Sequence, residues 1–88
     1  MAFEWDPAKD IANRRKHGVR FADAVAVFED ELAITIDDDH ANEERFITIG
    51  SDVLGRVLTV VYTWRGDDIR IISARKATAR EARVYRDG

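Results

Sequence analysis

Residues 57–76 of this 88-residue chain read VLTVVYTWRGDDIRIISARK, and this stretch decides the fold. Its first part, residues 57–64, is rich in β-branched and aromatic side chains, which favour strands. Gly66 and Asp67 then provide a two-residue hairpin turn, and residues 68–74 return as a second strand. The stretch therefore predicts an antiparallel hairpin at the centre of a sheet.

The turn also fixes which side chains share a face. With Gly66-Asp67 as the turn, Arg65 lies opposite Asp68 and Thr63 opposite Arg70. Strict alternation then gives one face to Arg65, Thr63, Arg70, Val61 and Ile72, and the other to Trp64, Ile69, Tyr62, Ile71 and Ser73. Two arginines are thus predicted to converge near the end of the hairpin, with Arg75 and Lys76 in the junction after the second strand.

The chain before the hairpin predicts helices followed by strands. A short strand at residues 3–5 precedes Asp6-Pro7, a typical N-cap and first helical residue. The first helix is expected over residues 7–17, with Ala8, Ile11 and Ala12 as its apolar content and Gly18 as its stop. A second helix over about 20–29 buries Phe21, Ala24, Val25 and Phe28. Strands follow at about 32–36 and 45–50.

After the hairpin, Thr78 and Glu81 form a capping-box pattern that opens a last helix, which continues to about Arg86. The fold class is therefore α+β: two N-terminal helices, a four-stranded, mostly antiparallel meander sheet with a short extra N-terminal strand, and a C-terminal helix. The length favours one domain over residues 1–88.

Composition indicates a soluble, cytoplasmic protein. Hydrophobic residues make up 45% of the chain and charged residues 35%, which is typical of a globular domain. The absence of Cys excludes disulfides and thiolate metal sites. No apolar run is long enough to span a membrane, and the N-terminus has no signal-peptide pattern. We therefore expect no membrane partner.

The charge is unevenly distributed along an acidic chain of net charge −3. Residues 1–20 carry five basic and three acidic side chains. Residues 21–64 carry two basic and ten acidic side chains, and residues 65–88 carry seven basic and four acidic ones. The ends are therefore basic and the middle is acidic. Such a molecule can bind an anion with one surface and a basic partner with another, although a solvated mixture of charges is equally compatible with these totals.

Arginines gathered in this way suit phosphate, because guanidinium groups bind phosphate oxygens in pairs and stay charged. Around a scissile phosphate they would stabilise the charge that develops there. RNA carries its own nucleophile, the 2′-hydroxyl, so a nuclease that uses it needs a base, an acid and cations but no metal or other cofactor. Trp64 and Tyr85 are candidates for base stacking.

Simpler interpretations stay open. Each arginine alone can be a surface or ion-pair residue, Trp64 and Tyr62 can belong to the core, and His17 can be a favourable cation at a helix C-terminus. An acidic cluster could be taken for a metal site but lacks the glycine and spacing of a calcium loop. It comprises Asp37, Asp38, Asp39, His40, Glu43 and Glu44. Ser73 lacks the glycines of a nucleophile elbow and is not expected to be catalytic.

The chain resembles the BrnT family of bacterial toxins over nearly its whole length. The resemblance rests on FEWDPAKDIANRRKHGVRFADAVAVFED at residues 3–30, EERFITIG at 43–50, and GRVLTVVYTWRGDDIRIISARKATAREARVYRDG at 55–88. Their shared motifs are W-D-P-x-K, K-H-G-V-x-F, E-R-x-x-x-I-G and R-I-I-S-A-R-K-A. The acidic residues 37–39 and the alanines at 79 and 82 depart from the pattern of relatives.

The resemblance implies a RelE-like fold and a type II toxin that cleaves RNA and inhibits translation. It also implies a cognate BrnA-like antitoxin with a ribbon-helix-helix DNA-binding part. Toxin and antitoxin together would repress their own operon, so that operator DNA is contacted only through the antitoxin complex. The alternative is a non-catalytic binding module that acts only as antitoxin partner or corepressor.

The matching positions imply roles for individual residues. Arg65, Arg70 and Arg75 are expected to bind phosphate and the transition state. Candidates for proton transfer or base contact are Lys76, Glu81 and Tyr85. The wider RNA-binding surface is expected to include Lys16, His17, Arg80 and Arg83, and no metal is expected at the site.

Overall fold

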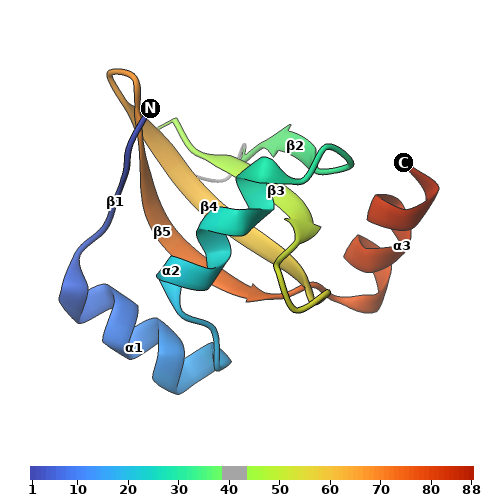
Figure 1. Ribbon diagram of the computed structural model, residues 1–88, viewed down its shortest axis with the longest axis horizontal. Coiled ribbons are helices and arrows are strands. Elements are labelled where there is room, and N and C mark those ends of the chain that lie inside the picture. Colours follow the sequence, from blue (N-terminus) through green and yellow to red (C-terminus); the bar gives the residue numbers. More distant parts are fainter. Residues whose placement is uncertain (39–43) are drawn as a thin grey trace.

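A five-stranded mixed sheet forms the centre of the molecule (Figure 1). The computed structural model describes residues 1–38 and 44–88. The strand order is β1-β5-β4-β3-β2, with β1 parallel to β5 and the other neighbours antiparallel. The α+β class and the order of helices and strands agree with the prediction. The elements are β1 (Phe3–Glu4), α1 (Pro7–His17), α2 (Phe21–Ala24), the 3₁₀ helix η1 (Val25–Glu29), β2 (Ile34–Asp37), β3 (Phe46–Ser51), β4 (Val57–Arg65), β5 (Asp68–Lys76) and α3 (Ala79–Asp87).

The predicted hairpin register is confirmed near the turn. Arg65 lies opposite Asp68, Trp64 opposite Ile69 and Thr63 opposite Arg70. Gly66 has a φ of 61°, a left-handed conformation that glycine adopts without a steric penalty. Both strands are longer than predicted, and β5 continues through Lys76.

A β-bulge in β5 changes the facing beyond Ile71. Tyr62 pairs with Ile71, but the preceding residue Val61 pairs with Ser73, so β5 carries one extra residue at this point. The prediction that Ser73 shares a face with Ile71 is therefore wrong, because it assumed uninterrupted alternation. Arg75 was expected in a junction but lies within β5, opposite Thr59.

The core fills the space between one face of the sheet and the segment from Val19 to η1. The expected helix over residues 20–29 is α-helical only in its first turn and then tightens into η1. A 3₁₀ helix has three residues per turn, so Val27 is buried in place of the predicted Val25 and Phe28, which are half-buried. The buried cluster contains Val19, Phe21, Ala24, Val27, Leu58, Val60, Tyr62, Ile69, Ile71 and Ala74.

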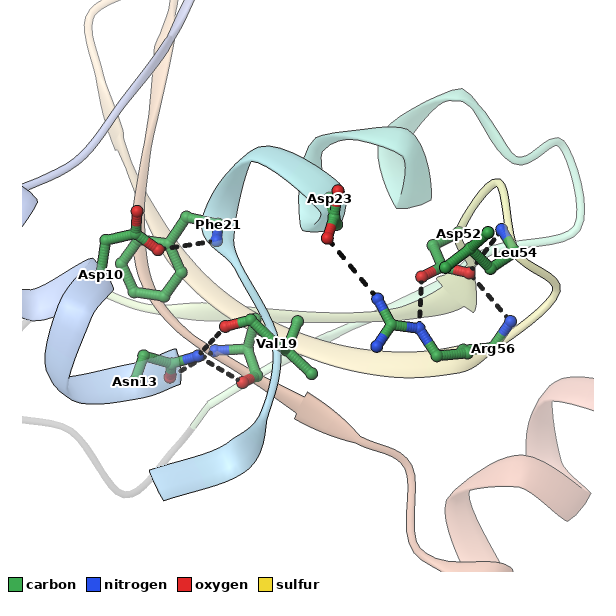
Figure 2. A network of polar contacts seen from close by, with 9 residues as sticks. Asp10, Asn13, Val19, Phe21, Asp23, Asp52, Leu54 and Arg56 are labelled. Carbon is green, nitrogen blue, oxygen red and sulfur yellow. Dashed lines mark hydrogen bonds and ion pairs between the residues drawn. The ribbon is translucent and has the colours of Figure 1, made fainter. Parts of the chain in front are cut away.

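Helix α1 is attached by polar side chains and not by the predicted apolar ones. Its ends are as expected: Asp6 accepts a hydrogen bond from the Ala8 amide, and Gly18 is the left-handed C-cap. Ile11, however, is 56% exposed. The helix is held by buried Asn13 and by Asp10, whose carboxylate accepts from the Phe21 amide at 2.9 Å (Figure 2).

Helix α3 stands apart from α1 and α2 (Figure 1). Its predicted capping box is present: the Thr78 hydroxyl accepts from the Glu81 amide, and the Glu81 carboxylate accepts from the Thr78 amide. The helix buries none of its own residues fully. On the sheet face opposite the core, called the open face below, Thr59 and Ile49 are buried, whereas Ile47, Val61, Thr63 and Arg70 are half-buried and Arg65 is exposed. None of the helices in the described ranges is long and apolar enough to cross a membrane.

Candidate functional site

Three arginines of the β4–β5 hairpin share the open face of the sheet. Arg65 and Arg70 belong to this face because Thr63, which precedes Arg65 by two residues, lies opposite Arg70. Arg75 is an odd number of residues beyond Arg70, so strict alternation would place it on the core side. The bulge at Ile72 reverses the alternation, and Arg75 lies opposite Thr59 on the open face.

The first two arginines are loosely paired with one carboxylate. Glu4 lies beside Arg70 in the parallel β1–β5 pair, and its Oε1 is 3.7 Å from Arg70 Nη1 and 3.8 Å from Arg65 Nε. The Arg65 side chain is 61% exposed. Exposed ion pairs at such distances stabilise the fold by little, so Glu4 holds neither guanidinium group firmly.

Arg75 is held much more firmly. Its Nη1 and Nη2 donate to Glu81 Oε1 at 2.6 Å and to Oε2 at 3.0 Å. This paired contact with a carboxylate fixes the plane of the guanidinium group. The hydrogen bond from Arg75 is the largest cause that lowers the pKa of Glu81 to about 2, while Glu81 raises the pKa of Arg75.

The Glu81 carboxylate has two further donors. Its Oε1 accepts from the Thr78 amide at 2.8 Å and from Thr59 Oγ1 at 3.1 Å. Thr59 has no exposed surface, and it lies opposite Arg75 in the β4–β5 ladder. Glu81 therefore joins the start of α3 to both central strands.

Tyr85 holds the other end of α3. Its hydroxyl donates to Asp30 Oδ2 at 2.6 Å, and Asp30 also accepts from the amides of Ser51 and Leu32. The hydrogen bond from Tyr85 is the largest cause that lowers the pKa of Asp30, and the same bond raises the pKa of Tyr85. The Tyr85 hydroxyl is thus engaged by the segment after η1.

The remaining predicted site residues are spread over the surface. Lys76 lies opposite Leu58, in the register that faces the core side, and so is separated from Arg75 by the sheet. Lys16 and His17 end α1, which packs beside β5. Arg80 and Arg83 line a groove of about 570 Å³ next to β2, together with Ile34, Val84, Asp87 and Gly88.

The two aromatic residues of β4 have different environments. Tyr62 is 4% exposed and belongs to the core, as one interpretation of the sequence expected. Trp64 is 45% exposed, so the expectation that it is a core residue is wrong. It lies next to the hairpin turn, and its ring makes an edge contact with the Tyr62 ring, with 6.3 Å between the two ring centroids.

One cation has a structural role. Arg56 Nε contacts Asp52 Oδ2 at 2.7 Å, and its Nη2 is 3.7 Å from Asp23 (Figure 2). Burial raises the pKa of Asp52, but hydrogen bonds from the amide and side chain of Arg56 and from the Leu54 amide outweigh this effect and lower it. Arg56 therefore belongs to a turn-stabilising network and not to the open face.

Part of the acidic cluster considered as a metal site lies outside the described residues, namely Asp39, His40 and Glu43. Within residues 1–38 and 44–88 no three His, Asp or Glu side chains are grouped in a way that could hold a metal ion.

Two residues near the arginines were missed at the sequence level. Thr59 looks like any other residue of a β-rich run, and its hydroxyl gains a role only because Glu81 reaches it from α3. Glu4 was assigned only to the opening strand, and its position between Arg65 and Arg70 depends on the parallel pairing of β1 with β5. The available signal for Thr59 was its position as a polar residue within the apolar run 57–62.

Comparisons with known proteins agree with this arrangement. The family model described as the ribonuclease toxin BrnT of type II toxin–antitoxin systems matches residues 5–81. The chain is also similar to the crystal structure of the Brucella abortus ribonuclease toxin BrnT, with a TM-score of 0.72 and 26% sequence identity over 89% of this chain and 97% of that chain. Comparison with curated protein sequences gave no match.

Proposed function

Because the chain belongs to the BrnT family of ribonuclease toxins of type II toxin–antitoxin systems, we propose that it cleaves RNA without a metal ion and that the open face of the β4–β5 hairpin binds the RNA. The observation that supports this most strongly is the common facing of Arg65, Arg70 and Arg75, which depends on the bulge in β5. A bulge that redirects a side chain is a common feature beside active sites.

The distance between the arginines implies that they bind different phosphates of the RNA. Arg70 and Arg75 lie opposite Thr63 and Thr59, which are four residues apart on β4, so the two arginines are roughly 13 Å apart at about 3.3 Å per residue. That distance is too long for both to contact the same phosphate, so the RNA backbone would run along the hairpin. We assign Arg75, the one arginine of the three held by a paired carboxylate contact, to the scissile phosphate. Arg65 and Arg70 would hold the flanking backbone.

The reaction that fits these groups uses the RNA itself as nucleophile. The 2′-oxygen loses its proton and attacks the adjacent phosphorus, the bond from phosphorus to the 5′-oxygen breaks, and that oxygen takes up a proton. The products are a 2′,3′-cyclic phosphate and a 5′-hydroxyl. A fixed guanidinium beside the phosphate stabilises the charge that builds up on its oxygens. Lys76, Glu81 and Tyr85 were the proton-transfer candidates, but the contacts of Glu81 and Tyr85 suit them better to holding α3.

Purified toxin and a single-stranded RNA test the activity. We expect cleavage with 2′,3′-cyclic phosphate ends, at the same rate with and without EDTA. Arg75→Ala should slow cleavage roughly 100-fold. Arg65→Ala and Arg70→Ala should each weaken RNA binding and lower its salt slope by about one. Arg20→Ala is the matched control, because Arg20 is exposed at the N-cap of α2 and has no ion-pair partner in the described ranges.

Two results would contradict the proposal. Cleavage that requires an added divalent ion would refute metal independence. Intact RNA after incubation with wild-type toxin that still binds its antitoxin would favour the alternative, a non-catalytic antitoxin partner. Induced expression in a host without the antitoxin distinguishes a ribonuclease from a non-catalytic partner in cells. We expect the wild-type toxin to arrest growth and the Arg75→Ala variant to permit it.

Membership of a type II toxin–antitoxin family implies a cognate antitoxin as partner. We further propose that this antitoxin carries a ribbon-helix-helix DNA-binding part and that the complex represses its own operon. Gel-shift measurements should then show operator binding by the complex and none by the toxin alone at physiological salt. Operator binding by the toxin alone would contradict this assignment.

A further inference from the structure

The guanidinium group of Arg75 has one edge in use and one edge free. A guanidinium carries five N–H donors in a planar fork. Nη1 and Nη2 donate to the Glu81 carboxylate, and Nη1 also lies 3.4 Å from the Lys76 carbonyl oxygen. The Nε–H and the second Nη2–H, which form the side edge of the fork, have no acceptor among residues 1–38 and 44–88. This edge is a complete two-donor site for an oxyanion.

The carboxylate that holds the first edge cannot easily turn away. Glu81 Oε1 is fixed by the Thr78 amide at the start of α3 and by the fully buried Thr59 on β4. Thr59 and Arg75 are opposite each other across the ladder, so strand, helix cap and guanidinium meet at one carboxylate. The direction of the free edge is therefore set by Glu81.

On this basis, and resting on the proposed ribonuclease function, we propose that Glu81 is a positioning residue that orients Arg75 so that its Nε–Nη2 edge binds the scissile phosphate of RNA. Glu81 itself neither touches the RNA nor takes a proton in the reaction. The Glu81 carboxylate and the phosphate occupy two different edges of one guanidinium, so they bind together and do not compete.

Under this proposal, a positive charge alone at position 75 is insufficient to bind both Glu81 and the scissile phosphate. A lysine ammonium is a point charge without a planar fork. Lysine at position 75 would pair with Glu81 and leave no second pair of donors for the phosphate. Arg75→Lys should therefore lose most of the activity of the wild type, close to the loss in Arg75→Ala, although the net charge of the protein is unchanged.

Glu81→Gln tests the positioning role. Glutamine keeps an acceptor for the Thr78 amide, as in other capping boxes, but loses the charged second oxygen that holds Arg75. We expect a loss in kcat of roughly 10- to 100-fold, the size that small misplacements of a reacting group produce. The loss should be the same at each pH between about 5 and 9, because no titrating group of the reaction is removed. Glu29→Gln, an exposed change of the same kind, should leave the rate unaltered.

A double-mutant cycle separates this role from the alternatives. If Glu81 acts through Arg75, adding Glu81→Gln to Arg75→Ala should cause no further loss. A further loss in the double variant, or a changed acidic limb of the pH–rate profile in Glu81→Gln, would show that Glu81 acts as a base and would overturn the inference. Full activity of Glu81→Gln together with an inactive Arg75→Ala would also overturn it while leaving the proposed function intact. Failure of the wild type to cleave RNA would refute the proposed function itself.

Thermal unfolding of the same variants distinguishes a loss of folding stability from a loss of the positioning of Arg75. Arg75→Ala and Glu81→Gln both remove the paired contact between Arg75 and Glu81, so a purely structural effect predicts that activity falls in each in proportion to its loss of melting temperature. The positioning role predicts that kcat falls in Glu81→Gln even at a temperature where the variant is fully folded. Normal kcat under those conditions would contradict it.

Discussion

The side-chain amide of Asn13 pairs with the backbone of Ala74 through two hydrogen bonds. Nδ2 donates to the Ala74 carbonyl at 2.8 Å, and Oδ1 accepts from the Ala74 amide at 3.1 Å. A neighbouring strand would make the same pair of bonds, but β1 reaches only Ile69 and Arg70. Asn13 thus satisfies part of the exposed edge of β5 and fixes α1 to it. Nδ2 also donates to the Val19 carbonyl at 2.9 Å.

We expect Asn13→Ala to lower the free energy of unfolding by about 2–4 kcal/mol, because it leaves the buried Ala74 backbone groups without partners. Urea unfolding followed by circular dichroism measures this. Arg14→Ala is the control, since Arg14 is exposed on the same helix and should change stability by no more than about 0.5 kcal/mol. Equal stabilities of the two variants would refute the role of Asn13.

Gly50 should be intolerant of any side chain. A Cβ at this position would lie 2.9 Å from Val27 Cγ1 and 3.0 Å from Ala33 Cβ, closer than packed carbon atoms approach. We expect Gly50→Ala to destabilise the protein by about 1–3 kcal/mol, the usual cost of overpacking. The double variant Gly50→Ala/Val27→Ala relieves the closest contact, so it should lose less stability than the sum of its two single variants. Additive losses would contradict the steric explanation.

We expect Tyr85→Phe to increase the local opening of α3 more than it lowers the free energy of unfolding of the whole protein. The variant removes the 2.6 Å hydrogen bond to Asp30, while the helix buries no apolar residue fully that could hold it in place. Hydrogen exchange of the α3 amides should accelerate by about tenfold, which corresponds to the loss of about 1.4 kcal/mol expected for a hydrogen bond to a charged group. Exchange of β4 amides is the internal control and should stay slow. Uniform acceleration in both elements would argue against α3 as a separately opening unit.

The sequence was sufficient for the local features of the fold. The Gly66-Asp67 turn fixed the pairing of Arg65 with Asp68, and the capping box of α3 was visible in the spacing of Thr78 and Glu81. These features depend on residues close in the chain. They explain why the order of elements could be predicted although their packing could not.

The facing of Arg75 needed tertiary information. Alternation predicts two arginines on one face, and only the bulge at Ile72 adds the third. Nothing in the sequence around Ile72 marks the extra residue, because a bulge is defined by the pairing of β5 with β4. The partners of Glu81 were hidden for a similar reason. A capping box explains its contact with Thr78, but Thr59 and Arg75 come from strands that the helix meets only in the folded chain.

In the core, the burial pattern of the 3₁₀ helix η1 also could not be predicted from the sequence alone. Phe21, Ala24, Val25 and Phe28 fit an α-helical period, whereas a period of three buries Val27. The two periods share their first members and diverge only after one turn. Contacts with β3, where Gly50 allows Val27 to approach closely, decide between them.

The Arg75–Glu81 pair makes the stability of the protein sensitive to acid. The pKa of Glu81 is about 2 in the folded protein, compared with an ordinary value of 4.5. A carboxyl group with a lowered pKa contributes stability above its unfolded pKa and loses it as the pH falls through the folded pKa. Its contribution is therefore fully present above about pH 5 and is lost between about pH 4.5 and pH 2. It amounts to at most about 3.5 kcal/mol, from a difference of about 2.5 pKa units at about 1.4 kcal/mol per unit.

Chemical unfolding from pH 7 to pH 2.5 measures this contribution. Asp30 and Asp52 also have lowered pKa values, so the wild type should lose stability through all three groups. Glu81→Gln should be less stable than the wild type at pH 7, and the difference should shrink as the pH falls, because the wild-type carboxyl becomes protonated. Glu29→Gln should give a curve parallel to the wild type. A constant difference between Glu81→Gln and the wild type down to pH 2.5 would show that Glu81 is not held as a charged partner of Arg75.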